Sequence, residues 1–315
     1  MDERQKRKFN KFKRNLNVLL IANHDWCALG EQYARSLRSI GVNATMFIRK
    51  KHKLNYPNQG TQFKNNKQIL THVKNATIVH FMHSQRSIPK ISLAGKKVVV
   101  SHTGSAYRIN YAELNKIFNP IVDLTIVGGD LFGKGAKNEH YIPGGIVDTE
   151  KLKPFYKRTS NKIIIGHFPS DYKATEGNKI ANIMKGVKGN FKFIYDPTRV
   201  GWIEQIKRMS ECDIYIERLT GINGFGMTAL EAASLGKILF TPYEFETKYN
   251  EALGDFAPII FKSGGKNLVE KAEEFISLPD DELLKMKKKS RAWVEKNHSY
   301  KAVGMRFLEL YKSIL

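Results

Sequence analysis

The sequence has few cysteines and no long apolar run, and both absences limit the kind of protein it encodes. Its two cysteines, Cys27 and Cys212, are far apart and form no CxxC pair. We therefore expect neither a disulfide framework nor a zinc site, and infer a reducing compartment. The longest apolar runs, such as 18–22 and 98–100, are far shorter than the ~20 residues of a membrane span. The first residues are charged with no apolar segment behind them, unlike a secretory signal, so we expect a cytoplasmic protein.

Acidic residues are scarce relative to basic ones. The chain has 52 Lys and Arg against 30 Asp and Glu, a formal net charge of +22 at pH 7, and a pI near 9.8. Such a field attracts nucleic acid, anionic lipid or an anionic substrate, but it does not define a fold. The charge makes a basic nucleic-acid-binding protein one candidate. Because the lysines are scattered and no recognition motif with interleaved aromatics stands out, we expect no nucleic-acid partner.

Apolar segments of strand length alternate with helical patterns along the whole chain. With 315 residues and 42% hydrophobic residues, the sequence is sufficient for two domains with ordinary cores. The alternation predicts an α/β fold with parallel, doubly wound sheets. The expected strands cover residues 17–22, 44–48, 76–83, 97–102, 122–127, 162–166, 191–195, 214–216 and 238–240. The expected helices include 111–118, 179–184, 202–209 and 302–315.

The most informative stretch is residues 221–237, a glycine loop that passes into a helical pattern at Met227. Gly224 and Gly226 leave backbone amides uncovered, and the helix start adds N–H groups with partial positive charge. Together they can bind a phosphate or diphosphate. Glu231, one turn into the helix, can accept hydrogen bonds from a pair of sugar hydroxyls. A nucleotide fits both features, although a lone glycine loop can also serve packing only.

This stretch resembles the C-terminal-domain signature of the retaining glycosyltransferases of family 4, a GT-B family. The sequence keeps Gly224-Phe-Gly-Met227, Glu231-Ala232 and Gly236-Lys237. It departs where Asn223 replaces the first Glu of the signature and Ile238 replaces its Pro. The resemblance implies the GT-B fold: two Rossmann-like doubly wound domains facing across a cleft, with a C-terminal helix that returns to the N-terminal domain.

The resemblance also implies how the chain is divided. The run 141–152 looks like the family's crossover out of the first domain. We expect a basic leader over 1–16, an N-terminal Rossmann-like acceptor domain over 17–154, a C-terminal Rossmann-like nucleotide-sugar domain over 155–300, and a C-terminal helix over 301–315.

On the donor side, the resemblance implies that Glu231 holds the ribose of the nucleotide. Lys173 has the spacing of the family's phosphate-binding Lys, and His167 stands in the position of its Arg. A fixed cation there would stabilise the leaving diphosphate. Asp196, at the next strand end, would border the base. The expected donor-binding residues are Lys173, His167, Ser170, Gly224, Phe225, Gly226, Met227, Thr228, Glu231 and Asp196.

Three residues are candidates for catalytic contact with the donor sugar. His102 lies in the run 101–108, which resembles the family's His-Gly-Ser segment, and matches the histidine beside the sugar there. The family's first loop Glu also contacts the sugar, and here Asn223 keeps an amide at that place. Glu217, at the end of the preceding strand, is an alternative carboxylate. On the acceptor side we expect Gly30 and Arg108.

Two histidines at one strand end, His80 and His83, raise the possibility of a metal site. No third ligand follows nearby in the sequence. Enzymes of this fold class generally work without a bound metal, because side chains and amides neutralise the diphosphate. We expect no metal and no other cofactor, with the nucleotide sugar as a substrate.

These features predict a glycosyltransferase, hexosyltransferase-like, that moves a sugar from a nucleotide-diphosphate-sugar to a glycan, lipid-linked or cell-envelope acceptor with retention of configuration. The replacement at Asn223 keeps open a catalytically silent GT-B subunit as an alternative.

The leader adds a prediction about location. Residues 1–16 carry seven basic and two acidic residues, and Phe9, Phe12 and Leu16 would share one face of a helix. Such a segment binds anionic membrane surfaces, so we expect peripheral association with the inner face of the membrane. The alternative is a disordered, solvated leader, since no strong helix cap is evident.

Overall fold

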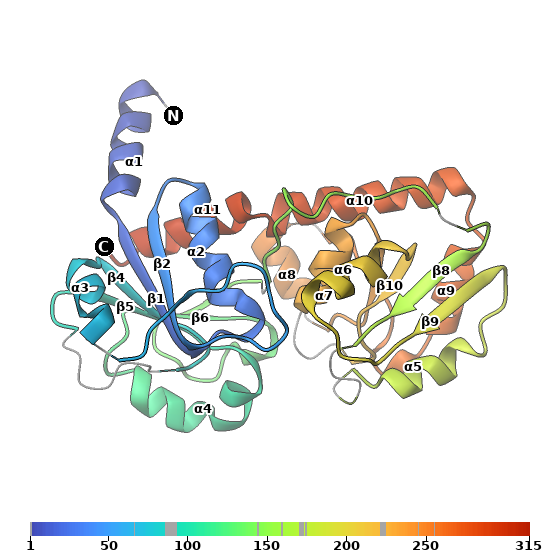
Figure 1. Ribbon diagram of the computed structural model, residues 1–315, viewed down its shortest axis with the longest axis horizontal. Coiled ribbons are helices and arrows are strands. Elements are labelled where there is room, and N and C mark those ends of the chain that lie inside the picture. Colours follow the sequence, from blue (N-terminus) through green and yellow to red (C-terminus); the bar gives the residue numbers. More distant parts are fainter. Residues whose placement is uncertain are drawn as a thin grey trace. The chain divides into compact units, whose positions relative to one another are not determined.

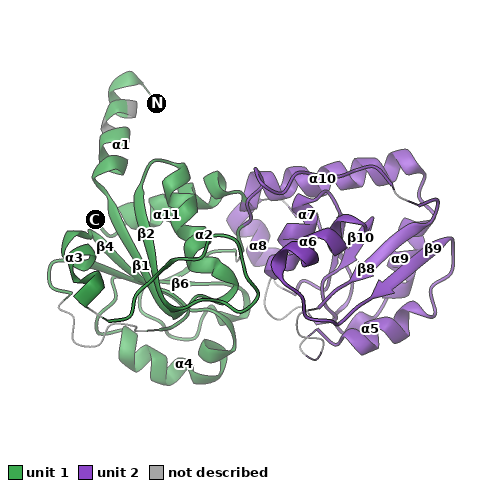
Figure 2. Cartoon of the chain, in the orientation of Figure 1, with its two compact units in different colours: residues 1–146, 299–315 green, residues 147–298 purple. Residues whose placement is uncertain are grey.

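Two parallel sheets, each flanked by helices, organise the chain in the computed structural model (Figure 1). The structure describes residues 2–65, 67–85, 93–143, 145–158, 160–169, 173, 175–220, 225–244, 246–254 and 256–315. The chain divides into unit 1, residues 1–146 with 299–315, and unit 2, residues 147–298 (Figure 2). The predicted α/β class with parallel sheets is confirmed.

Unit 1 contains a seven-stranded sheet in the order β3-β2-β1-β4-β5-β6-β7. Leu20 on β1, which lies between β2 and β4, is aligned with Met46 of β2 and with His80 of β4. The inner strands are almost continuously apolar because helices cover both faces of the sheet. The strands are β1 (Asn17–His24), β2 (Asn43–Lys50), β3 (Thr61–Gln62), β4 (Ile78–Phe81), β5 (Lys97–Ser101), β6 (Leu124–Val127) and β7 (Glu139–Tyr141).

The helices of unit 1 form two layers. On one face, Leu37 of α2 and Phe307 of α11 pack with Leu20. On the other face, Ile69 of α3 and Phe118 of α4 pack against strand side chains. The C-terminal helix α11 therefore returns to the unit that contains the N-terminus, as predicted. The helices are α1 (Glu3–Asn15), α2 (Leu29–Ser39), α3 (Lys67–Asn75), α4 (Gly104–Phe118) and α11 (Tyr300–Lys312), with short 3-10 turns η1 (Trp26–Ala28) and η2 (Gly129–Leu131).

The basic leader is a capped helix, so the alternative of a disordered leader is wrong. At the start of α1, the Gln5 N–H donates to Asp2 Oδ1 at 2.7 Å, and the Asp2 N–H donates to Gln5 Oε1 at 3.0 Å. This reciprocal pair is a capping box. The signal for this cap in the sequence is Asp2 followed three residues later by Gln5.

The apolar face of α1 is turned toward the core of unit 1. Phe9 and Phe12 are half-buried against that core, and Leu16 is buried within it. The ammonium groups of Lys13 and Lys312 lie 5.0 and 4.4 Å from the Phe9 ring centroid. These three apolar residues therefore already have protein partners. Among the described residues, no helix has the length and apolarity needed to cross a membrane.

Unit 2 contains a five-stranded sheet in the order β12-β11-β10-β8-β9. Ala229 of α7 and Trp293 of α10 pack in the core on one face, and Ile180 of α5 and Phe275 of α9 pack on the other. The strands are β8 (Ile163–His167), β9 (Phe191–Tyr195), β10 (Ile214–Ile216), β11 (Ile238–Thr241) and β12 (Ile259–Ile260). The helices are α5 (Gly177–Met184), α6 (Trp202–Ser210), α7 (Met227–Ser234), α8 (Glu246–Leu253), α9 (Leu268–Ile276) and α10 (Asp280–His298), with a 3-10 turn η3 (Ser263–Gly265).

Two lysines are buried in unit 2. Lys237, 1% exposed, donates to the carbonyls of Phe155 at 3.0 Å and Ser210 at 2.7 Å. Lys287, 3% exposed, pairs with Asp213 at 2.6 Å. A buried cation needs such partners. The Lys of the Gly236-Lys237 signature thus ties three segments of unit 2 together.

Candidate functional site

The glycine loop of unit 2 ends at Gly226, the N-cap residue of α7. No described side chain caps this helix, so the first-turn N–H groups can bind an anion. A Cβ atom at position 226 would lie 2.8 Å from Arg218 Nη2 and 3.0 Å from Glu217 Oε1. A Cβ at this position would therefore displace these two side chains from the helix start. Three predicted site residues, Ser170, Asn223 and Gly224, lie outside the described residues.

An ion pair lies beside the start of α7. Arg218 Nη2 is 2.7 Å from Glu217 Oε1, which also accepts from the Gly226 N–H at 2.5 Å. The second oxygen of Glu217 accepts from Thr241 Oγ1 at 3.0 Å. With both oxygens bonded and the side chain 1% exposed, Glu217 positions the loop. Its predicted contact with the donor sugar stays a prediction.

Arg218 is a residue that the sequence analysis missed. Its side chain is 17% exposed, and its Nε has no hydrogen-bond partner among the described residues. The sequence signal was its place directly after the acidic end of β10 and before the glycine loop. A guanidinium held at a helix start suits a diphosphate, because phosphate oxygens can accept two parallel N–H bonds from it.

Glu231 of α7 is a buried carboxyl group with one unsatisfied oxygen. It is 2% exposed, and Oε1 accepts from Trp202 Nε1–H at 2.6 Å. Its Oε2 has no partner in the part of the chain that the structure describes. Burial raises the pKa of Glu231 to about 7, partly opposed by the Trp202 hydrogen bond. A buried acceptor without a donor costs free energy, and a ligand hydroxyl would relieve that cost.

His167 does not supply the cation expected at its position. It is fully buried, with Nδ1 2.8 Å from the carbonyl oxygen of Ile216. Burial lowers the pKa of His167 to about 4, so its imidazole is neutral near pH 7. Asp196 accepts from the Thr198 N–H at 2.8 Å, and hydrogen bonds from Thr198 lower its pKa.

The other predicted donor residues take different positions. Phe225 is part of the core, with its ring 4.5 Å from that of Tyr243, centroid to centroid. Met227 and Thr228 are half-buried in the first turn of α7. Lys173 is exposed. Contact of Phe225 with a nucleotide would require its aromatic cluster to open, so only the first turn of α7 presents these residues to a ligand.

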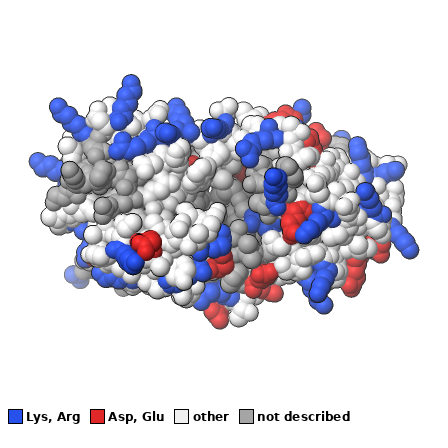
Figure 3. All heavy atoms as spheres, turned by 90° about the horizontal axis from the view of Figure 1, so that it is seen from below, with Lys and Arg blue, Asp and Glu red and all other residues white. Residues whose placement is uncertain are grey.

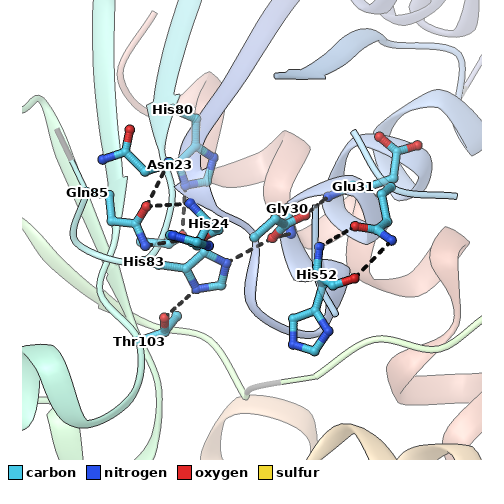
Figure 4. A network of polar contacts seen from close by, with 12 residues as sticks. Asn23, His24, Gly30, Glu31, His52, His80, His83, Gln85 and Thr103 are labelled. Carbon is cyan, nitrogen blue, oxygen red and sulfur yellow. Dashed lines mark hydrogen bonds and ion pairs between the residues drawn. The ribbon is translucent and has the colours of Figure 1, made fainter. Parts of the chain in front are cut away.

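In unit 1, a chain of hydrogen bonds joins the ends of β1, β4 and β5 (Figure 4). Asp25, 4% exposed, accepts from the backbone N–H groups of Gly30 at 2.7 Å and Glu31 at 3.0 Å. His83 Nε2 lies 2.9 Å from Asp25 Oδ1, and His83 Nδ1 lies 2.7 Å from Thr103 Oγ1. Asp25 and Thr103 cannot be predicted as members of one site, because nothing in their spacing in the sequence shows that the fold brings them together.

The backbone at the end of β4 is unusual. His83 and Ser84 both have φ 58°, a left-handed conformation that costs free energy for residues other than glycine. This turn directs His83 to Thr103 and Ser84 to His102, whose Nδ1 lies 2.9 Å from Ser84 Oγ. Strain of this kind persists where surrounding contacts fix it, often at functional sites.

His102 is buried at the end of β5, with its ring stacked 3.9 Å from that of Tyr107. Burial lowers the pKa of His102 to about 3, so the ring is neutral. Its Nε2 has no hydrogen-bond partner among the described residues. A neutral imidazole can offer that nitrogen to a ligand hydroxyl, which is compatible with the predicted sugar contact.

The remaining predicted residues of unit 1 have structural partners. His80 is bonded through Nδ1 to Tyr311 Oη and through Nε2 to Ser101 Oγ, both at 2.8 Å. Arg108 forms a two-point ion pair with Asp130. Over the described residues, no group of three or more His, Cys, Asp or Glu side chains is placed to hold a metal ion.

Gly30 is required by close packing. A Cβ atom there would lie 2.6 Å from Met46 Cε and 3.1 Å from Asp25 Oδ1. Its N–H already donates to Asp25. The acceptor-binding roles predicted for Gly30 and Arg108 therefore stay predictions.

An exposed aromatic group lies next to Asp25. Trp26 is 55% exposed, and its ring stacks on His24 with centroids 5.5 Å apart. The ring of His52 meets Trp26 edge-on at 6.0 Å. An exposed indole with polar neighbours gives a flat apolar surface with hydrogen-bonding groups at its rim. A sugar ring has the matching combination of apolar C–H faces and hydroxyls.

Solved glycosyltransferases share this fold. HepE of Anabaena, in complex with UDP, is similar over 95% of this chain and 100% of its own, with 11% identity and a TM-score of 0.65. Sucrose-phosphate synthase of Thermosynechococcus elongatus is similar over 95% and 99%, with 11% identity and a TM-score of 0.60. WaaG, a glycosyltransferase involved in lipopolysaccharide biosynthesis, is similar over 93% and 99%, with 12% identity and a TM-score of 0.55.

These likenesses show that the chain has the GT-B fold of two Rossmann-like domains. No protein-family model matches the sequence, and neither does any curated protein.

Proposed function

We propose that the protein is a glycosyltransferase that uses a nucleotide-diphosphate-sugar donor. The observation that carries this proposal is the start of α7. Among the described residues, no side chain caps this helix N-terminus and none bonds Oε2 of Glu231, one turn further on. One binds an anion and the other accepts from a hydroxyl, which is the pairing a nucleoside diphosphate needs. Structures of similar fold include HepE with UDP and with UDP-glucose.

The candidate donor-binding groups of unit 2 have separate roles in this proposal. The first-turn amides of α7 and the guanidinium of Arg218 bind the diphosphate, and Glu231 binds the ribose. Lys173 adds a cation from an exposed position, and Asp196 borders the base. Charge that develops on the leaving diphosphate is then met by groups already in place. The resemblance of 224–237 to family 4 supports a hexosyl donor and transfer with retention.

The acceptor belongs to unit 1 in this proposal. Trp26 offers a surface for a sugar ring, and His102 offers Nε2 to the transferred sugar. The excess of positive charge favours an anionic acceptor, such as a glycan or lipid-linked acceptor at the cytoplasmic face of a membrane. On the face shown in Figure 3, Lys and Arg side chains are spread out rather than gathered in one stripe.

Binding is tested by thermal shift against a panel of nucleoside diphosphates and nucleotide sugars. A ligand that binds the native state at 100 times its Kd stabilises it by about 2.7 kcal/mol. We expect at least one diphosphate to raise the melting temperature of the wild type, and the increase to shrink in Glu231→Gln. If no nucleotide raises it, the proposal is wrong.

In one alternative, the protein binds a nucleotide but does not catalyse sugar transfer. Both oxygens of Glu217 are bonded and His167 is neutral near pH 7, so neither replaces a charge of the family's site. This favours a catalytically silent GT-B subunit as the second candidate. Such a subunit would bind a nucleotide in the thermal-shift panel and release no diphosphate from any donor.

A further inference from the structure

We propose that the hydrogen-bonded chain Thr103–His83–Asp25 accepts the proton of the acceptor hydroxyl during transfer, with Thr103 as the residue that touches that hydroxyl. The inference rests on the proposed glycosyl transfer and assigns a site in unit 1 to its acceptor step. It concerns side chains whose positions the structure describes: Asp25 and His83 are buried, and Thr103 is half-buried.

The direction of the hydrogen bonds follows from the donors around Asp25. Its two oxygens accept from the N–H groups of Gly30 and Glu31, and an ionised carboxylate only accepts. The proton between His83 Nε2 and Asp25 Oδ1, 2.9 Å apart, therefore belongs to His83. A neutral imidazole protonated at Nε2 presents a lone pair at Nδ1. Thr103 Oγ1, 2.7 Å from Nδ1, must then donate its proton to His83.

This order of hydroxyl, imidazole and buried carboxylate is the arrangement that makes a hydroxyl a stronger base or nucleophile. The carboxylate orients the ring, fixes its tautomer and stabilises the imidazolium that forms when the hydroxyl proton arrives. Asp25 and His83 act through Thr103, so they are positioning residues.

The side chain of Thr103 does not cap the helix that it precedes. It is the N-cap residue of α4, yet its side chain makes no capping hydrogen bond. A threonine at an N-cap ordinarily bonds an N–H of the first helical turn. Here the hydroxyl donates to His83 instead, and its oxygen lone pairs can accept a hydrogen bond from a ligand hydroxyl. The residues that follow it, Gly104 and Ser105, are exposed, so a ligand can approach this end of α4.

The turn that places His83 is held in a costly conformation. His83 and Ser84 are consecutive left-handed residues with side chains, and both side chains are bonded to residues that follow β5. Glycine adopts this conformation at the least cost. The chain instead has two residues with hydrogen-bonding side chains there.

The proton transfer balances as follows. The acceptor oxygen forms a bond to the anomeric carbon of the donor while the bond from that carbon to the diphosphate oxygen breaks, and the nucleoside diphosphate leaves with the bonding electrons. The acceptor proton passes to Thr103 Oγ1 as the Thr103 proton passes to His83 Nδ1. The imidazolium pairs with Asp25 and later releases its proton to water. The acceptor must lose this proton whichever face of the sugar it attacks.

Several titratable groups surround His83. Asp25, which follows β1, is bonded to His83, and Glu31 of α2, whose N–H donates to Asp25, accepts from Arg38 at 2.5 Å. His80 of β4 and His102 after β5 are neutral near pH 7, because burial lowers the pKa of each to about 3. The negative charge nearest to His83 is therefore Asp25, which favours the imidazolium that the transfer produces.

The first test measures release of UDP from UDP-glucose with water as the acceptor, in the wild type, Thr103→Val and Thr103→Ser. Loss of a general base costs about 10²–10⁴-fold in rate, so we expect at least a 100-fold decrease in Thr103→Val and near-wild-type turnover in Thr103→Ser. Thr125→Val is the matched control, since it removes another threonine hydroxyl of unit 1, bonded at 2.7 Å to the Lys137 carbonyl. It should keep the wild-type rate.

Affinity for UDP, measured by calorimetry on the same proteins, separates this inference from the proposed function. It should be equal in the wild type and Thr103→Val, because the proposed nucleotide-binding residues lie in unit 2. Wild-type turnover in Thr103→Val would overturn the relay while leaving nucleotide binding intact. An equal loss of rate and UDP affinity would also overturn it.

A second measurement does not depend on the donor. Nitrogen NMR of histidine-labelled protein, with His83 assigned by its absence in His83→Gln, reports which ring nitrogen carries the proton. We expect Nε2 protonated and Nδ1 unprotonated at pH 7.5. A proton on Nδ1 at that pH would remove the lone pair that the relay requires and overturn the proposal.

Discussion

The carboxyl ends of the two sheets differ in how their polar groups are satisfied. In unit 1, His83 is bonded both to Asp25 and to Thr103, so each of these three side chains has a hydrogen-bond partner, although the neighbouring His102 Nε2 has none among the described residues. In unit 2, Glu231 keeps a buried oxygen without a partner, and the Nε of Arg218 also has none among the described residues. A set of groups bonded to each other is suited to moving a proton, whereas unsatisfied groups are suited to binding a ligand. The same kind of strand end thus serves two chemical purposes.

Among the changes that test this difference between the two units, we expect the substitution of Arg218 to have the largest effect. Removing it in Arg218→Met leaves Glu217 buried without its cation, which costs about 3–5 kcal/mol of unfolding free energy. We expect the affinity for UDP, used as the probe for the proposed nucleoside-diphosphate site, to be lost as well. The double variant Arg218→Met, Glu217→Gln should recover most of the stability and none of the affinity, as measured by urea unfolding and calorimetry.

The control is Arg158→Met, because Arg158 pairs with the exposed Asp280. An exposed pair contributes about 1 kcal/mol or less. UDP affinity that returned with stability in the double variant would show that Arg218 serves the fold only.

Glu231→Gln should show opposite changes in stability and binding. The pKa of Glu231 is raised to about 7 in the folded protein from 4.5. Because the unfolded chain loses this proton first, stability falls as pH rises from about 4.5 to about 7 and then levels off. The loss is about 3 kcal/mol at 1.36 kcal/mol per pKa unit. The variant lacks this loss, so it should be the more stable protein at pH 8.

Its UDP affinity should fall, since hydrogen bonds to a charged group contribute about 1.5–3 kcal/mol. Urea unfolding at pH 5 and pH 8, with Glu211→Gln as an exposed control in unit 2, checks the stability. If the variant binds UDP as tightly as the wild type, the ribose contact is wrong.

A substitution at His102 tests whether an unsatisfied group in unit 1 also contacts a ligand. The Nε2 of His102, at the end of β5, has no hydrogen-bond partner in the described part of the chain. One neutral hydrogen bond contributes about 0.5–1.5 kcal/mol, so His102→Gln should slow UDP-glucose turnover by up to about tenfold with UDP affinity unchanged. His140→Gln on β7 is the control. The rate should also show no titration of His102 between pH 5 and 8, because its pKa is about 3.

The smallest effect concerns the basic face of α1. Phe9 and Phe12 pack on unit 1 and Leu16 is buried there, so membrane attraction would come from charge, about 1 kcal/mol per basic residue near an anionic surface. Lys11→Gln should weaken pelleting with anionic liposomes about fivefold, and added salt should weaken it further. Lys288→Gln, in unit 2, is the control. Equal pelleting of both variants would exclude α1 as the contact. Deleting residues 1–16 is a poorer test because it removes Leu16 from the core.

The sequence patterns predicted the sheets well and the site only in part. All nine expected strands occur, because runs such as 97–101 must be apolar to lie between two helix layers. The three strands that were missed, β3, β7 and β12, have two or three residues each, too few for a periodic pattern. A strand of that length forms because it pairs with the neighbouring strand of the sheet.

The unpredicted parts of the site depend on contacts between distant residues. Asp25 and His83 are 58 positions apart, and no local pattern marks them as partners. The open start of α7 was predicted because its glycines and Glu231 are adjacent in the sequence. His167 stands in the sequence position of the family's Arg, but its burial, which keeps the imidazole neutral near pH 7, does not follow from that position. Local chemistry can be read from spacing, but burial and long-range pairing are set by the fold.

The buried lysines of unit 2 give the molecule an internal reporter of unfolding. In a chain with 52 Lys and Arg, most lysines react quickly with an amine-acylating reagent. Lys237 and Lys287 are 1% and 3% exposed, and their ammonium groups are held by carbonyls and Asp213. Acylation at these two positions therefore requires unit 2 to open. The rate of their labelling, followed by peptide mass spectrometry, would time that opening without any substrate and would slow when a ligand binds unit 2.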